Sequence, residues 1–409
     1  MRAGIGVQWQ ARRSAAAAPE RRLGKDAITA LMIHGCFQFG ASMSGLFLNL
    51  YLWRLTQDLY VNGVYNIINF LITPVAFAIG GLITKRKDRM VTYRLGIMTI
   101  ALFYLLVIIA QEHVASWYIP FAVFNGIAGG LYWTGYLVLM YDVSTEQNRV
   151  RFLAVNMVVF NSAGLIGPAL AGFIIQLSGG LQGYIFVFLI AFLMFVTASV
   201  ISFRIPQLVS HHKAYYLNLM GLVMRKNALF VKGLAAFLIL GLFQGIMLFL
   251  PNILLFQTVG REDFVGYLGV FFSSLTVGTG YLISRRVGKE PVRKFVLYSS
   301  AGIVLGSIFL LYDVSAWTVV VFMIAFSICN PLAVNTLTSY YYGLIGKLPL
   351  KGQLRVESVV MRETFLNTGR VISIIMLLGL AGNLTSHWLP IVLTTVAVCQ
   401  FLLFWLIRE

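Results

Sequence analysis

The feature that most constrains this chain is a succession of long apolar segments, several of which run for 18 or more residues without a charge. A helix that crosses a bilayer needs about 20 mostly apolar residues, so segments of this kind are typical of membrane-spanning helices. Hydrophobic residues make up 59% of the chain and charged residues 11%, whereas soluble domains have roughly 45–50% and about 25%. The sequence predicts twelve spanning helices over residues 27–53, 60–83, 91–111, 117–141, 152–177, 183–203, 228–256, 264–284, 294–312, 316–343, 359–382 and 387–407.

A loop motif that occurs twice indicates an internal repeat. Residues 80–89 read GGLITKRKDR and residues 280–289 read GYLISRRVGK, at an offset of 200. Each copy follows one apolar segment and precedes the next, and a repeat half a chain apart indicates two structurally related halves. The shared positions are Gly80, Leu82, Lys85 and Arg89 in the first copy, and Gly280, Leu282, Arg285 and Lys289 in the second.

The longest polar gap, over residues 204–227, separates six apolar segments from six. We therefore expect a six-helix bundle over 27–203, a cytoplasmic linker over 204–227 and a second bundle over 228–409. Residues 1–26 are polar, rich in alanine and basic, and the apolar segment behind them is too long for a signal peptide. We expect them to form a cytoplasmic tail.

The positions of the basic residues predict the orientation. With the N-terminus inside, all but two of the 31 Lys and Arg residues fall on the inner side, and only Arg54 and Arg261 fall outside. This asymmetry follows the positive-inside rule, which predicts a multi-pass protein of the plasma membrane with both termini cytoplasmic. The net charge of +17 then needs no nucleic-acid partner, because no soluble domain carries it.

These features together resemble the major facilitator superfamily. The resemblance rests on twelve apolar segments, a six-plus-six division, a basic central loop and a Gly-x-Leu-x-x-[Lys/Arg] loop after the second and eighth segments. It extends over about residues 27–407. It implies an all-α membrane protein of two pseudo-symmetric six-helix bundles that transports by alternating access.

The chain departs from the family's loop pattern, Gly-x-Leu-x-Asp-Arg-x-Gly-Arg-Arg, at the acidic position. Thr84 and Ser284 stand there, and the glycine of the second copy comes one place late, at Gly288. The resemblance implies that the acidic residue helps to latch the two halves together. We therefore expect that particular latch to be missing.

Polar side chains recur on one face of the first predicted helix, in steps that follow the helical period, at His34, Gln38, Ser42, Gly45 and Asn49. Lipid offers no hydrogen-bond partners, so such side chains face either protein or a water-filled cavity. Asn66 in the second helix, and Gln244 and Asn252 in the seventh, are further candidates. The resemblance implies that Gln38 and Gln244 face each other across a central cavity. Hydrogen bonding between helices is the alternative; for the stripe in the first helix we favour cavity lining.

Helices four and ten combine aromatic and amide side chains with glycine. Trp133 and Tyr136 lie near Gly129 and Gly130, and the tenth helix carries Asn330 and Asn335. Small residues beside large aromatics suit a cavity for an amphipathic or aromatic ligand. Ordinary close packing at glycine is the alternative. The tyrosines at the end of the tenth helix, Tyr340, Tyr341 and Tyr342, are expected in an interfacial belt.

The eleventh helix carries the residues that are costliest to bury, namely Arg362, Glu363, Asn367 and Arg370. A charge at the bilayer centre costs about 2.5–3.5 kcal/mol on insertion scales, so such charges tend to be paired and functional. Glu363 is a candidate proton-binding carboxylate, with its pKa set by Arg362 or Arg370. The other interpretation, which we favour, is a structural or gating ion pair on the inner side.

The sequence therefore predicts a secondary transporter, most simply a monomeric exporter of a small amphipathic molecule that is a candidate for proton coupling. The pattern of Gly164, Gly167 and Pro168 resembles that of antiporter-type exporters in the family. A lipid or lipid-linked sugar translocase, and a non-transporting scaffold or sensor, remain alternatives. Cys36, Cys329 and Cys399 lack the spacing of a metal site. We expect no metal, no cofactor and no enzyme activity, because nucleotide loops and nucleophile–base sets are missing from the sequence.

Overall fold

The computed structural model describes residues 23–144, 148–207, 214–286, 292–349 and 353–407. Within these ranges the regular elements are all helices. The first half contains six long helices, which we call the N half: α2 (Lys25–Thr56), α3 (Leu59–Arg86), α4 (Arg89–Ala110), α5 (Tyr118–Asp142), α6 (Arg149–Ser178) and α7 (Gln182–Ser202). A short 3-10 helix, η2 (Gln111–Val114), joins α4 to α5.

A ten-residue helix, α8 (Leu217–Lys226), lies in the segment that connects the two halves. The second set, which we call the C half, consists of α9 (Ala228–Met247), α10 (Leu250–Val259), α11 (Glu262–Arg286), α12 (Val292–Tyr312), α13 (Ala316–Gly346), α14 (Arg355–Leu380), α15 (Trp388–Cys399) and α16 (Leu402–Leu406).

Eleven helical spans in the described part of the chain are long and apolar enough to cross a membrane. They coincide with eleven of the twelve predicted segments. The remaining predicted segment, 117–141, is observed as the helix α5, which is not among these eleven spans. The prediction of an all-helical membrane protein is confirmed, with eleven rather than twelve spans meeting the criterion of length and hydropathy.

Two predicted spans are interrupted rather than continuous. The segment 228–256 breaks between α9 and α10, where Pro251 stands in the first turn of α10. A proline ring clashes with the carbonyl four residues earlier, and that residue, Met247, is where α9 ends. The segment 387–407 breaks after Cys399, where the backbone tightens into bonds of the i→i−3 type, as from Gln400 N to Ala397 O.

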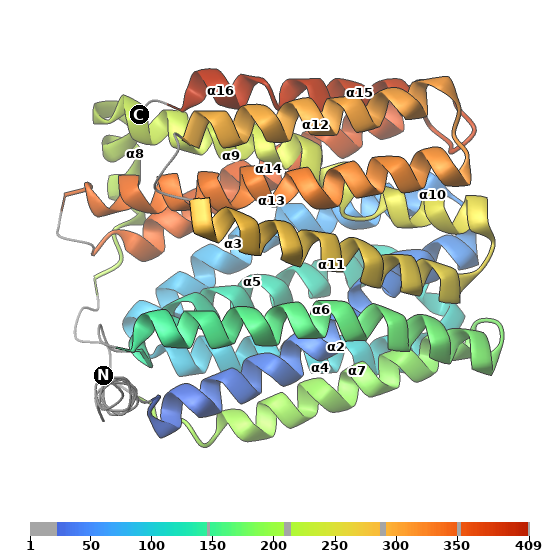
Figure 1. Ribbon diagram of the computed structural model, residues 1–409. Helices are drawn as coiled ribbons and strands as arrows, with labels where there is room; N and C mark the ends of the chain where they lie inside the picture. Colours follow the sequence, from blue (N-terminus) through green and yellow to red (C-terminus); the bar gives the residue numbers. More distant parts are fainter. Residues whose placement is uncertain (1–22, 145–147, 208–213, 287–291, 350–352, 408–409) are drawn as a thin grey trace, which may run out of the picture.

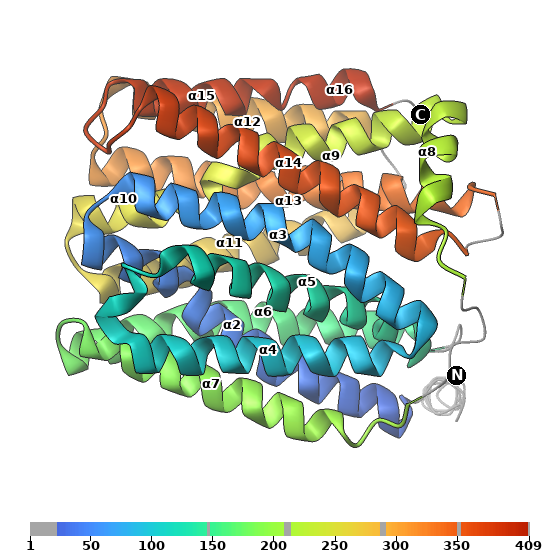
Figure 2. The same ribbon diagram turned by 180° about the vertical axis from the view of Figure 1, so that it is seen from behind.

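The long helices lie side by side, and the two halves meet along two helix pairs (Figures 1 and 2). One pair is α3 with α14, and the other is α6 with α11. The loop between α3 and α4, the helix α8 and the last turns of α11 and α13 lie at one end of the bundle, which we call the basic end (Figure 1). The loops between α6 and α7, and between α10 and α11, lie at the opposite end.

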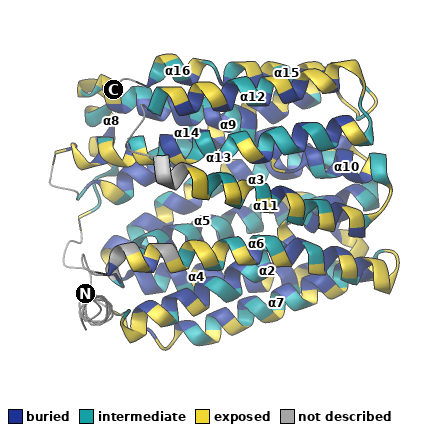
Figure 3. Ribbon diagram, in the orientation of Figure 1, coloured by how far each residue is buried: buried dark blue, intermediate teal, exposed yellow. Residues whose placement is uncertain are grey.

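Exposed residues recur along the outward faces of the helices (Figure 3), and many of them are large and apolar. Leu102 on α4, Leu193 on α7 and Ile308 on α12 are each more than 40% exposed. A soluble protein rarely leaves so much apolar area open to water. These faces are those expected to contact lipid.

Candidate functional site

A cavity of about 680 Å³ lies between the two halves at the basic end. Its floor is apolar and includes Phe77 of α3 with Val359 and Val360 of α14, all of which are buried. Its rim includes the exposed residues Gly346 and Arg355. The described residues that line it are Phe77, Lys85, Thr134, Leu137, Val138, Met140, Ser144, Leu153, Tyr342, Ile345, Gly346, Gln353, Arg355, Val356, Val359 and Val360. Both halves therefore form the wall, and the cavity opens toward the basic end.

Lys85 lines this cavity and connects the two halves. Its ammonium donates to the backbone oxygen of Gln353 at 2.9 Å and lies 3.5 Å from Glu357 Oε1. The Glu357 side chain is fully buried, and the same oxygen accepts the backbone N–H of Tyr216 at 3.0 Å. Because α3 belongs to the N half and α14 to the C half, this ion pair ties the halves together beside the cavity.

The connecting segment completes this junction through the neighbouring tyrosine. Tyr215 donates its hydroxyl to the backbone oxygen of Ala78 at 3.1 Å. Burial, together with the nearby Glu357 carboxylate, raises the pKa of Tyr215 to about 12. The phenol therefore stays protonated and remains a donor at neutral pH. Tyr215 contacts α3 and Tyr216 contacts α14, so the connecting segment is bonded to both halves.

The opposite end is closed by charged and small residues. Arg54, at the end of α2, donates to Glu262 Oε1 at 2.5 Å, and Tyr184 reaches the same oxygen at 3.5 Å. A Cβ atom placed on Gly172 of α6 would lie only 2.9 Å from the backbone oxygen of Glu262 and 3.2 Å from the Cα of Gly266. The glycine-proline region of α6 thus makes a close contact between the halves.

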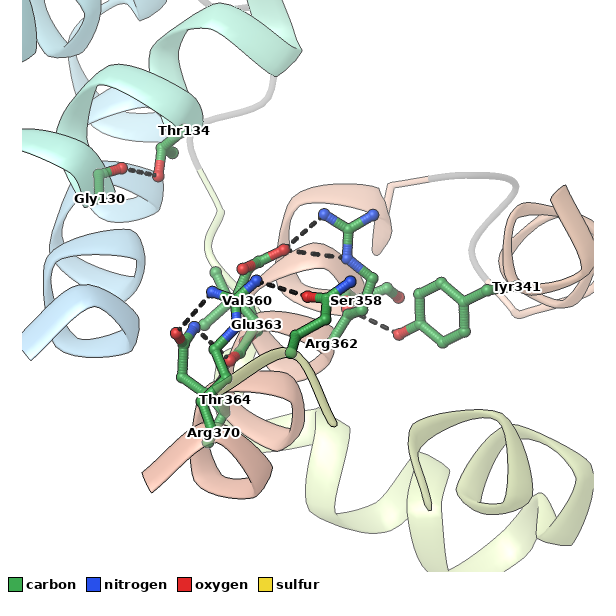
Figure 4. Close-up of polar contacts among 11 residues, drawn as sticks. Gly130, Thr134, Tyr341, Ser358, Val360, Arg362, Glu363, Thr364 and Arg370 are labelled. Atoms are coloured by element: carbon green, nitrogen blue, oxygen red, sulfur yellow. Dashed lines mark hydrogen bonds and ion pairs between the residues drawn. The ribbon is translucent and has the colours of Figure 1, made fainter. Parts of the chain in front are cut away.

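The charged residues of α14 separate into two groups (Figure 4). Arg362 donates to Glu363 Oε1 through Nη2 at 2.6 Å and through Nε at 3.1 Å. The candidate carboxylate is therefore paired with its own neighbour in sequence. Tyr341, shown beside this pair, is buried and donates to the backbone oxygen of Ser358 at 2.7 Å. The prediction that Tyr341 belongs to an interfacial belt is therefore wrong, because that hydroxyl points into the C half.

Arg370 forms the second group on α14. It donates to Gln244 Oε1 of α9 at 2.8 Å and to Asn367 Oδ1 at 3.1 Å. Its guanidinium lies 5.1 Å from the ring centre of Phe70, which belongs to α3 of the other half. Gln244 is thus engaged by Arg370 within the C half.

The N half buries an uncharged polar group around His34. The His34 Nδ1 lies 2.7 Å from the hydroxyl of Tyr132, and its ring stacks on Tyr136 with centres 3.9 Å apart. Tyr136 donates to Asn156 Oδ1 of α6 at 2.6 Å. Trp133 meets the His34 ring edge-on at 6.3 Å and also packs near the buried Phe77 at the cavity floor.

The polar stripe of α2 contacts several neighbouring helices. Ser42 donates to the backbone oxygen of Ala163 on α6 at 2.7 Å, and Asn49 accepts from Asn66 on α3 at 2.8 Å. Gln38 is buried beside Tyr132. These are the hydrogen bonds between helices that stood as the alternative to cavity lining, and the stripe residues are not in the lining of the cavity at the basic end.

The remaining amide candidates have different surroundings. Asn335 of α13 is exposed, whereas Asn330 and Asn252 are partly buried. None of the three lines the cavity at the basic end. A role for them in substrate binding stays a prediction.

The two copies of the loop motif are in different environments. In the first copy, the hydroxyl of Thr84 donates to Thr92 at 2.9 Å, and Arg89 is buried. Leu82 is half-buried. In the second copy, Leu282 is 61% exposed and Gly280 has no atom within 4 Å of where a Cβ would lie. Gly288 and the side chain of Arg285 lie outside the described residues.

Sequence reasoning missed Glu357, the carboxylate that pairs with Lys85 beside the cavity. The predicted span began at 359, two residues after it, so Glu357 was assigned to a loop. The available signal was Lys85, a cation in a motif that lacks its usual acidic residue. Among the described residues, no group of three or more His, Cys, Asp or Glu is placed to hold a metal ion.

Comparison with known proteins gives both a family and relatives. A family model described as Major Facilitator Superfamily matches residues 30–348. The chain is 28% identical over 381 residues to the uncharacterized protein YqgE of Bacillus subtilis (strain 168), covering 93% of this chain and 88% of YqgE.

Solved transporter structures share the fold. A crystal structure of the nucleoside transporter NupG matches with a TM-score of 0.73 at 12% identity, covering 94% of this chain and 100% of that chain. The D-xylose-proton symporter matches with a TM-score of 0.69 at 14% identity, covering 93% and 97%. Similarity at these identities concerns the fold alone.

Proposed function

The chain belongs to the Major Facilitator Superfamily of membrane transporters, and we propose that it exports a small amphipathic molecule by alternating access of its two halves. The observation that carries the proposal is the cavity at the basic end. Its walls come from both halves, its floor is apolar and its rim is polar. Such a cavity of about 680 Å³ falls within the usual range for small-molecule sites of about 300–1,000 Å³.

The opposite end is closed in this conformation, which sets the side from which a ligand can enter the cavity. The Arg54–Glu262 pair and the contact between Gly172 and Gly266 close that end while the cavity faces the basic end. Loops rich in Lys and Arg remain cytoplasmic under the positive-inside rule. With the basic end in the cytoplasm, and both termini with it, the cavity would load from inside. We place the protein in the plasma membrane and treat it as a monomer.

Proton coupling through Glu363 receives little support. The Glu363 carboxylate accepts two hydrogen bonds from the guanidinium of Arg362. A coupling group must exchange its proton during the cycle, and this pair would have to break first. We therefore assign the pair a structural or gating role.

Cross-linking across the opposite end tests the proposal. In a background with the three native cysteines replaced by serine, Arg54→Cys and Glu262→Cys would join the halves through a disulfide. Flux would be measured in proteoliposomes with two permanently charged probes, dodecanesulfonate and dodecyltrimethylammonium. The two probes have the same dodecyl tail and head groups of opposite charge. We expect flux of at least one probe, lost on oxidation and recovered with a reductant.

The control joins two helices within one half. Thr84→Cys and Thr92→Cys replace two hydroxyls that lie 2.9 Å apart on α3 and α4. This cross-link should leave flux unchanged, because alternating access moves the halves as units. Flux that survives the cross-link between halves, or no flux of either probe, would overturn the proposal.

A further inference from the structure

The charges that line the cavity at the basic end are all of one sign. Lys85 and Arg355 are its charged lining residues, and no Asp or Glu stands among the described lining residues. Lys85 lies against the inner wall and Arg355 on the rim, while the floor around Phe77, Val359 and Val360 is apolar. A ligand that matches this arrangement has a negative group at one end and an apolar body at the other.

We propose that the cavity binds amphiphiles with an anionic head group, which Lys85 and Arg355 would hold while the apolar body lies against Phe77 and Val359. This assignment of substrate class rests on the proposed transport function. The head group could come from a membrane lipid or from a free organic acid, sulfonate or phosphate ester. The chemistry that the cavity recognises is the same in each case.

Lys85 has the capacity for such a ligand. An ammonium group has three N–H donors. One is directed at the backbone oxygen of Gln353, and the distance of 3.5 Å to Glu357 is longer than the 2.7–2.9 Å of a charged hydrogen bond. Lys85 is also only 9% exposed. An anion bound there would meet a cation in a region where water screens poorly, which strengthens the attraction.

The proposal also predicts that a substitution at Glu357 strengthens the binding of an anionic ligand. Its carboxylate is the internal counter-ion of Lys85, so it competes with any bound anion for the same ammonium. Replacement by glutamine removes the charge and keeps an oxygen that can accept the Tyr216 N–H. The proposal therefore requires Glu357→Gln to bind an anionic amphiphile more tightly than the wild type.

The test measures binding of dodecanesulfonate and dodecyltrimethylammonium, below their micellar concentrations, to the full chain in nanodiscs of zwitterionic lipid. We expect dodecanesulfonate to bind at least tenfold more tightly. A charged hydrogen bond contributes about 1.5–3 kcal/mol, so Lys85→Gln should weaken binding about tenfold or more. Arg355→Gln, on the exposed rim, should weaken it less, and Lys85→Arg should keep most of the affinity.

Two controls locate the effect. Arg86→Gln removes an exposed cation next to Lys85 that does not line the cavity, and it should leave binding unchanged. Gly346→Trp places a large ring at the rim, where no atom lies within 4 Å of the new Cβ, and should block binding of both probes without disturbing α13. Adding phosphatidylglycerol to the nanodiscs as a competitor distinguishes a lipid head group from a free anion as the natural source.

The outcomes separate this inference from the proposed function. Equal binding of both probes, sensitive to Gly346→Trp, would overturn the anionic assignment and leave a transporter of amphiphiles standing. The anionic assignment would also be overturned if either Lys85→Gln or Glu357→Gln bound dodecanesulfonate with the affinity of the wild type. If neither probe binds, or binding ignores Gly346→Trp, the cavity is not the substrate site and both proposals fail.

Discussion

The N half and the C half share a helical plan, but the polar cluster around His34 in the N half and the polar residues of α14 in the C half differ in charge. In the N half, His34, Tyr132 and Tyr136 form an uncharged group that reaches only neighbouring helices of the same half. In the C half, α14 buries Glu357 and Glu363 and partly buries Arg362 and Arg370, and Arg370 lies against Phe70 of the N half. Uncharged groups cost less to bury than ions, which need partners in every state of the protein. Arg370, which contacts Phe70 of the N half, is therefore expected to be more sensitive to movement between the halves than His34.

The two copies of the loop motif also differ, in how closely they are packed. The first copy is packed, with Lys85 bonded across to α14, whereas the described part of the second copy is exposed. The first copy of the motif thus contributes to the contact between α3 and α14. The first copy has Thr84 where the family pattern has an acidic residue. The carboxylate that pairs with Lys85 of α3 is instead Glu357 of α14.

The largest effect is expected where the C half is packed most tightly. Gly241 of α9 faces the backbone oxygen of Leu366 on α14, so the Cβ of Gly241→Ala would overlap with main-chain atoms that cannot move aside. We expect a loss of about 3 kcal/mol in the free energy of unfolding, seen as a lower melting temperature in detergent. Gly278→Ala is the control, because no atom lies within 4 Å of its Cβ position. Equal melting temperatures for the two variants would contradict this packing.

The difference in buried charge gives the second prediction. Arg370→Met would leave the acceptors of Gln244 and Asn367 without donors, at a cost of about 2 kcal/mol. His34→Phe would lose one uncharged hydrogen bond and keep the stack on Tyr136, at about 1 kcal/mol. Thermal unfolding would rank the two. Adding Gln244→Leu to Arg370→Met should recover part of the loss, and a larger cost for His34→Phe would reverse the comparison of the halves.

The two loop copies offer a matched pair of substitutions. A Cβ in Gly80→Ala would lie 3.1 Å from Thr92 Cγ2 and 3.2 Å from Thr134, which forces a small adjustment. We expect a loss of about 1 kcal/mol. Gly280→Ala has open space, and an alanine in a helix gains about 0.5–1 kcal/mol over glycine. Chemical denaturation of both variants would test this, and equal losses would mean that both copies are packed.

The smallest effect is expected for Glu363→Gln on proton movement. Since Glu363 is paired with Arg362, we expect binding of dodecanesulfonate to release or take up the same number of protons in the variant as in the wild type. A pH indicator in weakly buffered solution would measure it. Proton movement in the wild type that disappears in Glu363→Gln would make this carboxylate the coupling group.

The helices were largely predictable because apolar length sets their bounds. The predicted span 183–203 is observed as Gln182–Ser202, and 316–343 as Ala316–Gly346. The break at Pro251 was not predicted, although the proline is plain in the sequence. Hydropathy alone does not take into account that proline lacks the backbone N–H of a continuous helix.

The site was less predictable, since its contacts join residues far apart in the chain. The polar residues of α14 were identified, but the bond from Arg370 to Gln244 spans 126 positions. Polarity singled out His34 and Asn49, whose observed partners are on neighbouring helices of the N half. The cavity floor of Phe77 and Val359 has no polar signature at all.

The connecting segment has a mechanical consequence. Because Tyr215 is bonded to α3 and Tyr216 to Glu357 of α14, this segment holds those two helices at a fixed separation at the basic end. If the halves move as proposed, the α3–α14 side would act as the hinge, and the cavity walls formed by α5 and α6 on one side and by α13 on the other would move about it. The cavity would then widen on the face away from the connecting segment.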